Sequence, residues 1–496
     1  MVGKYQLQLG ADQLTSGMSS SDYATDGALG NTTSGINPFV TPGIIRGTTN
    51  VTDTSTNLVD NIISTCEDGT GGLKARLLVG DVANYYTVDT SQVITKVFTG
   101  SDTTNYNYGR TDIAIQSNSG GTGAAFVSHG TEVAMWDGST NVTEDWYHST
   151  AYLVGTTTRP TVLTLNPHPL LTYNTNLWIA DGSQLHNIIP NTAQISTNCA
   201  CVNQSVFSLE LNVTIYALAI DPLTGLMMIS FQDVVNQGDV VSTQAYIGLY
   251  DGYSTGLRRK IPVDDLVTAF KNVGGQVYCM FGPKFGVWNG NGITFLRKLN
   301  NVTTNSPSTL IYKSRMANVG NILLIADGPT VLAYGDVIGG KPKGWFNVGF
   351  SLGAVDKITS LCPLGNNKFA LFNFATFASI YNLRVYDLSS TAGTSYTLNF
   401  NNIYFPRPIF VRRMRVITTG IAHTGLTDIT INITDEKGNT LPISTANRVV
   451  SVPAGTTYVI DFDFSSGKCQ AIQPAISASN GAWGLVRVII YYDIAE

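Results

Sequence analysis

The chain has 496 residues, of which 43% are hydrophobic and only 13% are charged. Lys and Arg number 29 against 34 Asp and Glu, so the formal net charge is −5 and the strongly basic character of many nucleic-acid-binding proteins is missing. We therefore expect no sequence-specific nucleic-acid partner. At roughly 100–200 residues per domain, the length allows two to four domains or one large β body with a smaller module.

Membrane, secretion and metal signals are weak. No stretch approaches the ~18 consecutive apolar residues of a membrane helix, and the first residues lack the apolar core of a signal peptide. The six cysteines are too scattered for a disulfide framework, and Cys199 and Cys201 are too close together for ordinary zinc spacing. We expect no membrane insertion, reduced and mostly buried thiols, and no metal or other cofactor.

Residues 1–70 are rich in Gly, Ser, Thr and Asn, include Pro38 and Pro42, and show no sustained helical or strand period. Such a segment buries too little apolar surface to fold alone. The pattern predicts an extended N-terminal arm that becomes ordered when a partner covers it.

From about residue 73 the sequence changes to short apolar runs separated by Gly, Asn and Asp, which is typical of antiparallel strands. The one segment with a helical signal is 263–271, where Asp264 could cap a short helical turn. The chain is therefore predicted to be all-β.

One unit recurs along this region: an apolar strand, then an aromatic or small residue followed by Asp or Asn, usually Gly, and then a second strand. The spacing of about 50 residues is that of a four-stranded propeller blade. The pattern predicts a β-propeller of about seven blades over residues 71–390. The Asp or Asn positions of the seven copies are Asp89, Asp137, Asp181, Asp251, Asn289, Asp336 and Asp387.

Two details of this repeat stay open. Asp327 rivals Asp336 as the sixth copy, because Ile325-Ala326-Asp327-Gly328 repeats the letters around Asp181. The interval between Asp181 and Asp251 is the longest, and we expect a loop insertion within 183–214. The alternative to a propeller is a set of unrelated hairpins, since Asp-Gly turns occur wherever strands reverse.

After residue 390 the strands become longer, and several alternate with period two. At least five strands in about 105 residues, joined by turns such as Lys437-Gly438-Asn439, favour a separate β-sandwich over residues 391–496. Three segments are thus predicted: the arm, the propeller and the sandwich.

No catalytic constellation stands out. Glycoside hydrolysis needs two carboxylates facing one sugar, and neighbours such as Glu144 and Asp145 point to opposite faces of a strand. The five histidines show no metal spacing, and no nucleophile elbow or phosphate-binding loop is present. We predict no catalytic, cofactor-binding or metal residues, and no enzyme activity.

The one concentrated positive feature is a cluster in the first long strand after the propeller, formed by Arg407, Arg412, Arg413 and Arg415. Arg413 and Arg415 should share one strand face. The cluster predicts an interface with an acidic partner surface or, as a weaker possibility, with nucleic acid passing nearby, and the alternative is a solvated strand face.

Three stretches together resemble virion proteins of tailed bacteriophages in which a β-propeller is followed by a β-sandwich, in particular tail nozzle and tail-hub propellers. They are the Asn37–Gly43 segment of the arm, the strand-turn-strand of 77–89, and the run 396–416 with its Tyr396-Thr397-Leu398-Asn399-Phe400 entry and Arg412-Arg413-Met414-Arg415-Val416 strand. The similarity lies in the pattern, and no site residue is carried over from it.

The resemblance implies a non-enzymatic structural component of the virion, assembled in the host cytoplasm. A tail nozzle or hub subunit is favoured, and an adaptor, a spike-like appendage or a head fibre stays open. The partners of such a component would be other virion proteins and further copies of itself around the tail axis. Two alternatives from other classes remain: a carbohydrate-binding adhesin that contacts a host surface glycan through Trp136, Trp146, Tyr250 or Trp288, and a glycan depolymerase with carboxylates in the axial funnel.

Overall fold

The structure is a computed structural model of the chain. The residues that it describes lie between 4 and 495, and the gaps between them are 11–29, 33–35, 38–44, 48–51, 59–61, 66–75, 81–82, 89–92, 102–110, 118–122, 137, 139–141, 148–162, 165, 191–198, 211, 238–239, 300–312, 328–329, 336–343, 348–356, 366, 376–379, 389–395, 420–425, 445–448, 454–457, 466 and 480–483. In this part of the chain the regular elements are β-strands and one 3-10 turn, η4 (Lys313–Arg315).

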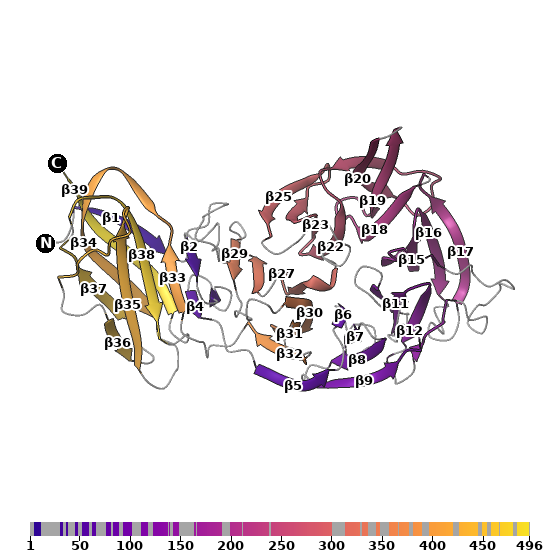
Figure 1. The fold of residues 1–496 in the computed structure, drawn as a ribbon, viewed down its shortest axis with the longest axis horizontal. Coiled ribbons are helices and arrows are strands. Elements are labelled where there is room, and N and C mark those ends of the chain that lie inside the picture. Colours follow the sequence, from indigo (N-terminus) through magenta and orange to yellow (C-terminus); the bar gives the residue numbers. More distant parts are fainter. Residues whose placement is uncertain are drawn as a thin grey trace.

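Seven sheets of four antiparallel strands follow one another around a ring (Figure 1). Six of them use four strands that are consecutive in the chain. In order, these are β6 (Ile62–Thr65), β7 (Arg76–Gly80), β8 (Asn84–Val88) and β9 (Ile94–Thr99); β10 (Ile113–Ser117), β11 (Gly123–His129), β12 (Glu132–Trp136) and β13 (Val142–Thr143); β14 (Leu170–Tyr173), β15 (Asn176–Asp181), β16 (Gln184–Pro190) and β17 (Cys199–Ser208); β18 (Val213–Ile220), β19 (Met227–Gln237), β20 (Val240–Tyr250) and β21 (Arg259–Val263); β22 (Val267–Val273), β23 (Gln276–Phe281), β24 (Lys284–Trp288) and β25 (Ile293–Lys298); β26 (Met316–Val319), β27 (Ile322–Asp327), β28 (Thr330–Gly335) and β29 (Gly344–Asn347).

The seventh sheet closes the ring. Its strands β30 (Lys357–Gly365), β31 (Lys368–Ala375) and β32 (Ile380–Asp387) come from the end of the ring, and its outer strand β5 (Thr52–Leu58) comes from the N-terminal region. β5 pairs antiparallel with β32, with Leu58 opposite Tyr381. The seven-bladed propeller predicted from the repeat is therefore confirmed.

The middle strands of the blades are apolar on both faces because a neighbouring blade covers each face. In β27, for example, every residue from Leu323 to Asp327 is buried. Buried serine hydroxyls add hydrogen bonds to backbone oxygens of the next blade: Ser128 donates to His168 O at 2.8 Å and Ser230 donates to Val267 O at 2.6 Å. The blades are thus joined by apolar packing and by buried hydroxyl-carbonyl bonds.

Six of the seven predicted repeat positions fall at or just after the end of the third strand of a blade, although Asp89, Asp137 and Asp336 themselves lie outside the described residues. Asp181 instead ends the second strand of its blade, as does Asp327 in the sixth blade. The identical letters around these two residues therefore mark a different turn, and Asp336 is the sixth copy.

Two local predictions are wrong. The region 183–214 is not a loop insertion, because it contains all of β16 and β17. The interval after Asp181 is long because Asp181 belongs to the second strand of its blade. The segment 263–271 is not helical, because β22 begins at Val267 and buries six of its seven residues between blades. Packing of this apolar run outweighs the weak helical signal.

The C-terminal body is one curled, sandwich-like sheet of 11 strands (Figure 1). β34 is its longest strand and pairs with β37, β38 and β39 at different points along its length. The strands are β1 (Tyr5–Gly10), β2 (Gly30–Thr32), β3 (Ile36–Asn37), β4 (Ile45–Gly47), β33 (Tyr396–Phe400), β34 (Ile403–Thr419), β35 (Leu426–Asp435), β36 (Val449–Pro453), β37 (Tyr458–Asp463), β38 (Cys469–Ala478) and β39 (Gly484–Ile494).

The described strands of residues 1–70 differ from a free arm, because they belong to the two folded bodies. β1 pairs with β39 along its whole length, and β4 also pairs with β39. The backbone N–H of Lys4 donates to Asp493 Oδ1 at 2.9 Å, and the Arg412 guanidinium donates to Asp493 Oδ2 at 2.8 Å. β5 and β6 belong to the ring. A partner in the same chain thus supplies the burial that this polar segment lacks alone.

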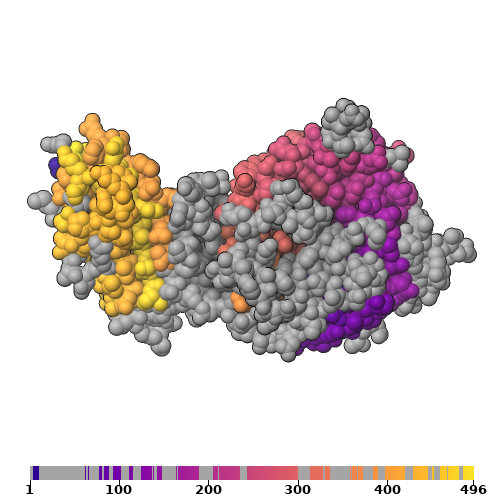
Figure 2. Space-filling model, viewed as in Figure 1, coloured from indigo at the N-terminus to yellow at the C-terminus, as the bar shows by residue number. Residues whose placement is uncertain are grey.

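Figure 2 shows the C-terminal sheet and the ring as two lobes. The predicted boundary at 390–391 falls between β32, which ends at Asp387, and β33, which begins at Tyr396. One continuous cluster of buried apolar side chains runs from the sixth and seventh blades into the C-terminal sheet, and includes Leu324, Leu371 and Met414. The core therefore does not stop at the boundary.

Candidate functional site

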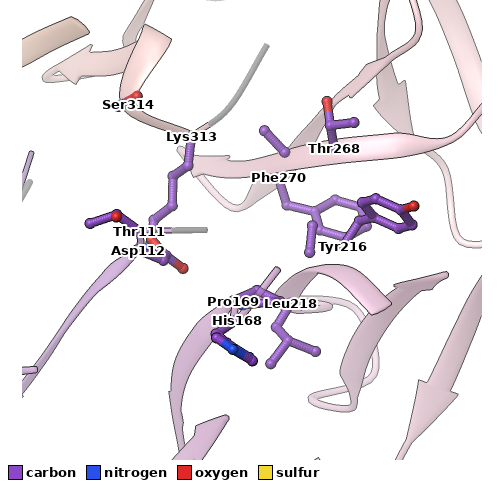
Figure 3. Close-up of a pocket in the computed structure, with 12 residues that line it drawn as sticks. Thr111, Asp112, His168, Pro169, Tyr216, Leu218, Thr268, Phe270, Lys313 and Ser314 are labelled. Carbon is purple, nitrogen blue, oxygen red and sulfur yellow. Dashed lines mark hydrogen bonds and ion pairs between the residues drawn. The ribbon is translucent and has the colours of Figure 1, made fainter. Parts of the chain in front are cut away.

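A pocket lies inside the ring, between the innermost strands of several blades and η4. It encloses about 40 Å³, and the space extends to about 480 Å³ when the part open to solvent is included. Figure 3 shows the lining side chains, which come from the second to fifth blades and from η4. They are Thr111, Asp112, His168, Pro169, Tyr216, Ala217, Leu218, Thr268, Ala269, Phe270, Lys313 and Ser314.

Two innermost strands carry a β-bulge where they reach this pocket. In β18 the pairing moves from Ile215 directly to Ala217, so Tyr216 is the extra residue. In β22 the pairing moves from Val267 to Ala269, so Thr268 is the extra residue. A bulge redirects a side chain that would otherwise follow the alternation of the strand, and such bulges are common beside functional sites.

The turn η4 lies within the ring against β6, β22 and β30, which are the innermost strands of the first, fifth and seventh blades. Lys313 extends from this turn to Asp112, which precedes the innermost strand of the second blade (Figure 3). The distance from Lys313 Nζ to Asp112 Oδ1 is 3.4 Å, and Nζ also donates to Ile113 O at 3.3 Å. The ion pair therefore joins η4, which precedes the sixth blade, to the second blade, and these two blades are not neighbours in a ring of seven.

Backbone donors hold the Asp112 carboxylate in place. Its Oδ1 accepts from the N–H of Ile113 at 2.8 Å, and its Oδ2 accepts from the N–H of Leu170 at 2.9 Å. Asp112 is the one carboxylate among the described lining residues. Glycoside hydrolysis requires two carboxyl groups, so the described lining does not favour a depolymerase site.

Two hydroxyls of the pocket have no hydrogen-bond partner within the described part of the chain. Thr111 is 8% exposed and Ser314 is 6% exposed, and both Oγ atoms are buried. Such groups are unusual, because a buried hydroxyl without a partner costs about 1–3 kcal/mol. They lie immediately beside Asp112 and Lys313 in the sequence.

His168 lines one side of the pocket, and its ring contacts backbone oxygens of the second and third blades. Its Nδ1 lies 2.9 Å from Ala180 O, and its Nε2 lies 3.0 Å from Gly130 O in the second blade. The Asp181 carboxylate lies 3.8 Å from His168 Nδ1 and 3.9 Å from His186 Nε2. Burial lowers the pKa of His186. This cluster joins the second and third blades.

The arginines predicted as an interface lie on β34 and are mostly paired within the chain. Arg415 donates to both carboxylate oxygens of Asp461, at 2.7 and 2.8 Å, and Arg413 donates to Asp463 at 2.6 Å. Arg412 binds Asp493, as described above, whereas Arg407 is exposed. The hydrogen bond from Arg415 lowers the pKa of Asp461. Three of the four positive charges therefore face acidic groups of their own sheet, and an interface role for the cluster stays a prediction.

The aromatic residues considered for sugar stacking on exposed loops are buried between blades instead. Trp136, Trp146, Tyr250 and Trp288 are all at most 5% exposed, which corrects that hypothesis. Of the histidines, His129, His168 and His186 are buried, and His148 and His423 lie outside the described residues.

The described residues contain no group of three or more His, Cys, Asp or Glu side chains arranged to hold a metal ion. Within the same residues, no helix has the length and apolar character needed to span a membrane.

Sequence reasoning missed the axial pocket. Its residues come from five blade regions that are brought together only when the ring closes, and the two bulges leave no recognisable letter pattern. The sequence feature that could have indicated the pocket is the position of its polar residues, because Asp112, His168 and Lys313 each lie just before the innermost strand of a blade.

The class of protein defined by this fold is an all-β protein with a seven-bladed propeller and a curled C-terminal sheet. No family model and no curated protein matches the sequence. One similar solved structure is PorZ, a bacterial surface component of the type-IX secretion system of Porphyromonas gingivalis, with 11% identity and a TM-score of 0.39; the match covers 81% of this chain and 46% of PorZ. The chain thus spans about half the length of PorZ.

Two smaller proteins are also similar. An exo-β-1,3-galactanase from Phanerochaete chrysosporium is 10% identical, with a TM-score of 0.26 and coverage of 70% of this chain and 99% of the galactanase. Hsv2 of Kluyveromyces lactis is 8% identical, with a TM-score of 0.35 and coverage of 66% and 98%. The propeller is defined by the strand pairing of the chain itself, independently of these similarities.

Proposed function

We propose that this chain is a non-enzymatic structural subunit of a tailed-bacteriophage virion, present in several copies around the tail axis as a nozzle, hub or adaptor component. The observation that carries the proposal is a double closure of the fold. β5 closes the ring by pairing with β32, and β1 pairs with β39 in the C-terminal sheet.

The double closure suits a part that transmits force within a particle. β39 pairs with β34 on one side and with β1 and β4 on the other, so the C-terminal strand is not a free edge. Opening the ring requires the loss of a complete strand pairing between distant parts of the chain. A body secured in this way resists fraying from either end.

The sequence pattern and the composition support the same proposal. The order of propeller followed by sheet resembles tail nozzle and hub proteins, and the described pocket contains one carboxylate, already paired with Lys313. Under this proposal the protein is located in the virion tail, and its partners are other virion proteins and further copies of this chain. The exposed side chain of Arg407 is available to an acidic group of a neighbouring protein.

The test is assembly of the full-length chain, followed by light scattering and negative-stain microscopy over a range of protein concentrations. Rings or defined oligomers are expected. A deletion of residues 1–10 removes β1 but keeps β5, so it probes the C-terminal sheet without opening the ring. A full-length chain that stays monomeric at every concentration, and fails to join purified tail particles, contradicts the proposal.

A further inference from the structure

We propose that the axial pocket binds a saccharide, with one neutral sugar unit placing its polar edge against Asp112, Lys313, Thr111 and Ser314. This inference is independent of the assembly role, since it concerns the inside of one ring. The observations behind it are the two buried hydroxyls without partners among the described residues, the charge pair of Lys313 and Asp112 in the pocket lining, and the aromatic wall opposite.

The unpartnered hydroxyls indicate that something polar is recognised here. Thr111 Oγ1 and Ser314 Oγ are buried and lack hydrogen bonds within the described residues, and they lie on two segments that are far apart in the sequence and both line the pocket. A hydroxyl can donate one hydrogen bond and accept two, so it matches a ligand that also carries hydroxyls. A ligand that bonds both groups would recover the free energy lost by their burial.

The charge pair favours a neutral polyhydroxylated ligand over an ion. Lys313 and Asp112 lie 3.4 Å apart and their charges cancel, so the pocket offers no net attraction to an anion or a cation. An ammonium donor beside a carboxylate acceptor nevertheless matches a sugar hydroxyl, which accepts from one and donates to the other. The two backbone N–H bonds to Asp112 hold this acceptor in position before any ligand arrives.

The remaining wall is apolar and aromatic. Phe270 is buried and Tyr216 is half-buried, and both lie across the pocket from Lys313 and Asp112 (Figure 3). The C–H groups of a sugar ring can pack on such a wall while its hydroxyls face the polar side. Since the enclosed part measures only about 40 Å³, one edge of the sugar enters and the rest of the ring occupies the open mouth.

The first experiment is saturation-transfer NMR of the full chain with glucose, N-acetylglucosamine and glucuronate, each at millimolar concentration. Transfer to at least one neutral sugar is expected. Thr111→Val and Ser314→Ala should each weaken binding about fivefold, the loss expected for one hydrogen bond of about 1 kcal/mol. Lys313→Met should weaken sugar binding further. The matched control is Lys368→Met, which should leave binding unchanged. Lys368 is 32% exposed, against 37% for Lys313, and it also faces an aspartate.

Thermal unfolding of the free protein separates binding from a structural role. Removal of an unpartnered hydroxyl should leave Tm unchanged or raise it, so Thr111→Val and Ser314→Ala should not destabilise the chain. Ser230→Ala, which removes a bonded hydroxyl, should lower Tm and leave sugar binding intact. The proposal is overturned if all three sugars fail to bind, if glucuronate alone binds, or if the two pocket variants lower Tm as much as Ser230→Ala.

Discussion

Leu58 lies opposite Tyr381 in the pairing that joins β5 to β32, so a strand from the start of the chain completes the last blade of the ring. In a propeller, each blade is stable only when its neighbours cover it. The fourth strand of the seventh blade therefore affects the whole ring, although it contributes only seven residues.

Deletion of residues 1–58 should abolish cooperative unfolding of the propeller and cause aggregation, because β32 becomes an exposed edge. Deletion of residues 1–10, which spares β5, should keep a cooperative transition with a lower Tm. Circular dichroism melts and size-exclusion chromatography measure both effects. A cooperative, monomeric protein lacking residues 1–58 would show that the ring closes without β5.

Gly286 in β24 is a position where an added methyl group has no space. A Cβ there would lie 2.5 Å from Ile293 Cγ2 and 2.6 Å from the backbone oxygen of Thr294. Gly286→Ala should therefore destabilise the protein by about 1–3 kcal/mol through overpacking. The control is Gly292→Ala, where no atom beyond the adjacent residues lies within 4 Å of the added carbon. Urea unfolding should show a clear loss for the first variant and almost none for the second.

The pair of Arg415 and Asp461 should stabilise the C-terminal sheet in a pH-dependent way. Because the pKa of Asp461 is lower in the folded protein, the stabilisation is present above the unfolded Asp pKa of about 3.9 and is lost as the pH falls through the folded value. A double-mutant cycle with Arg415→Met and Asp461→Asn should give a coupling of about 0.5–1 kcal/mol at neutral pH, since both side chains are about one-third exposed. A coupling that does not weaken in acid would contradict this account.

The three cysteines that the structure describes as free, Cys279, Cys362 and Cys469, should resist alkylation in the native protein. All three are buried, and burial raises the pKa of Cys469 to about 11, so little thiolate is present at neutral pH. Mass spectrometry after iodoacetamide treatment should find them unmodified until a denaturant is added. Rapid labelling of Cys469 in the native state would show that the start of β38 opens readily.

The ring was predictable because its signal is repetitive and local. Third-strand ends such as those near Asp251, Asn289 and Asp387 combine an apolar run with a turn residue, and the repeated spacing gives the blade length. Asp181 is an exception, because the sequence around it matches the repeat although it ends the second strand of its blade. The sequence of one copy alone does not distinguish a turn after the second strand from a turn after the third. The pairing of β1 with β39 and of β5 with β32 was not predictable, because β1 is short, β5 is polar throughout most of its length, and both take their partners from sheets formed by distant parts of the chain.

The pocket could not be predicted for a different reason. Asp112 and Lys313 are separated by four intervening blades in the chain, and their contact depends on the ring closing to its observed size. The arginine cluster was correctly located on one strand, but its acidic partners Asp461, Asp463 and Asp493 lie on other strands whose register the sequence alone does not determine.

The path of the chain makes the propeller an insertion within the C-terminal sheet, since the chain leaves this sheet after β4 and returns to it at β33. The chain therefore passes between the sheet and the ring twice, from β4 to β5 and from β32 to β33, whereas an appended domain has one such passage. A single connection allows a domain to swivel about its linker, but two connections oppose such rotation. A twist applied to the sheet would thus be passed to the ring as torque.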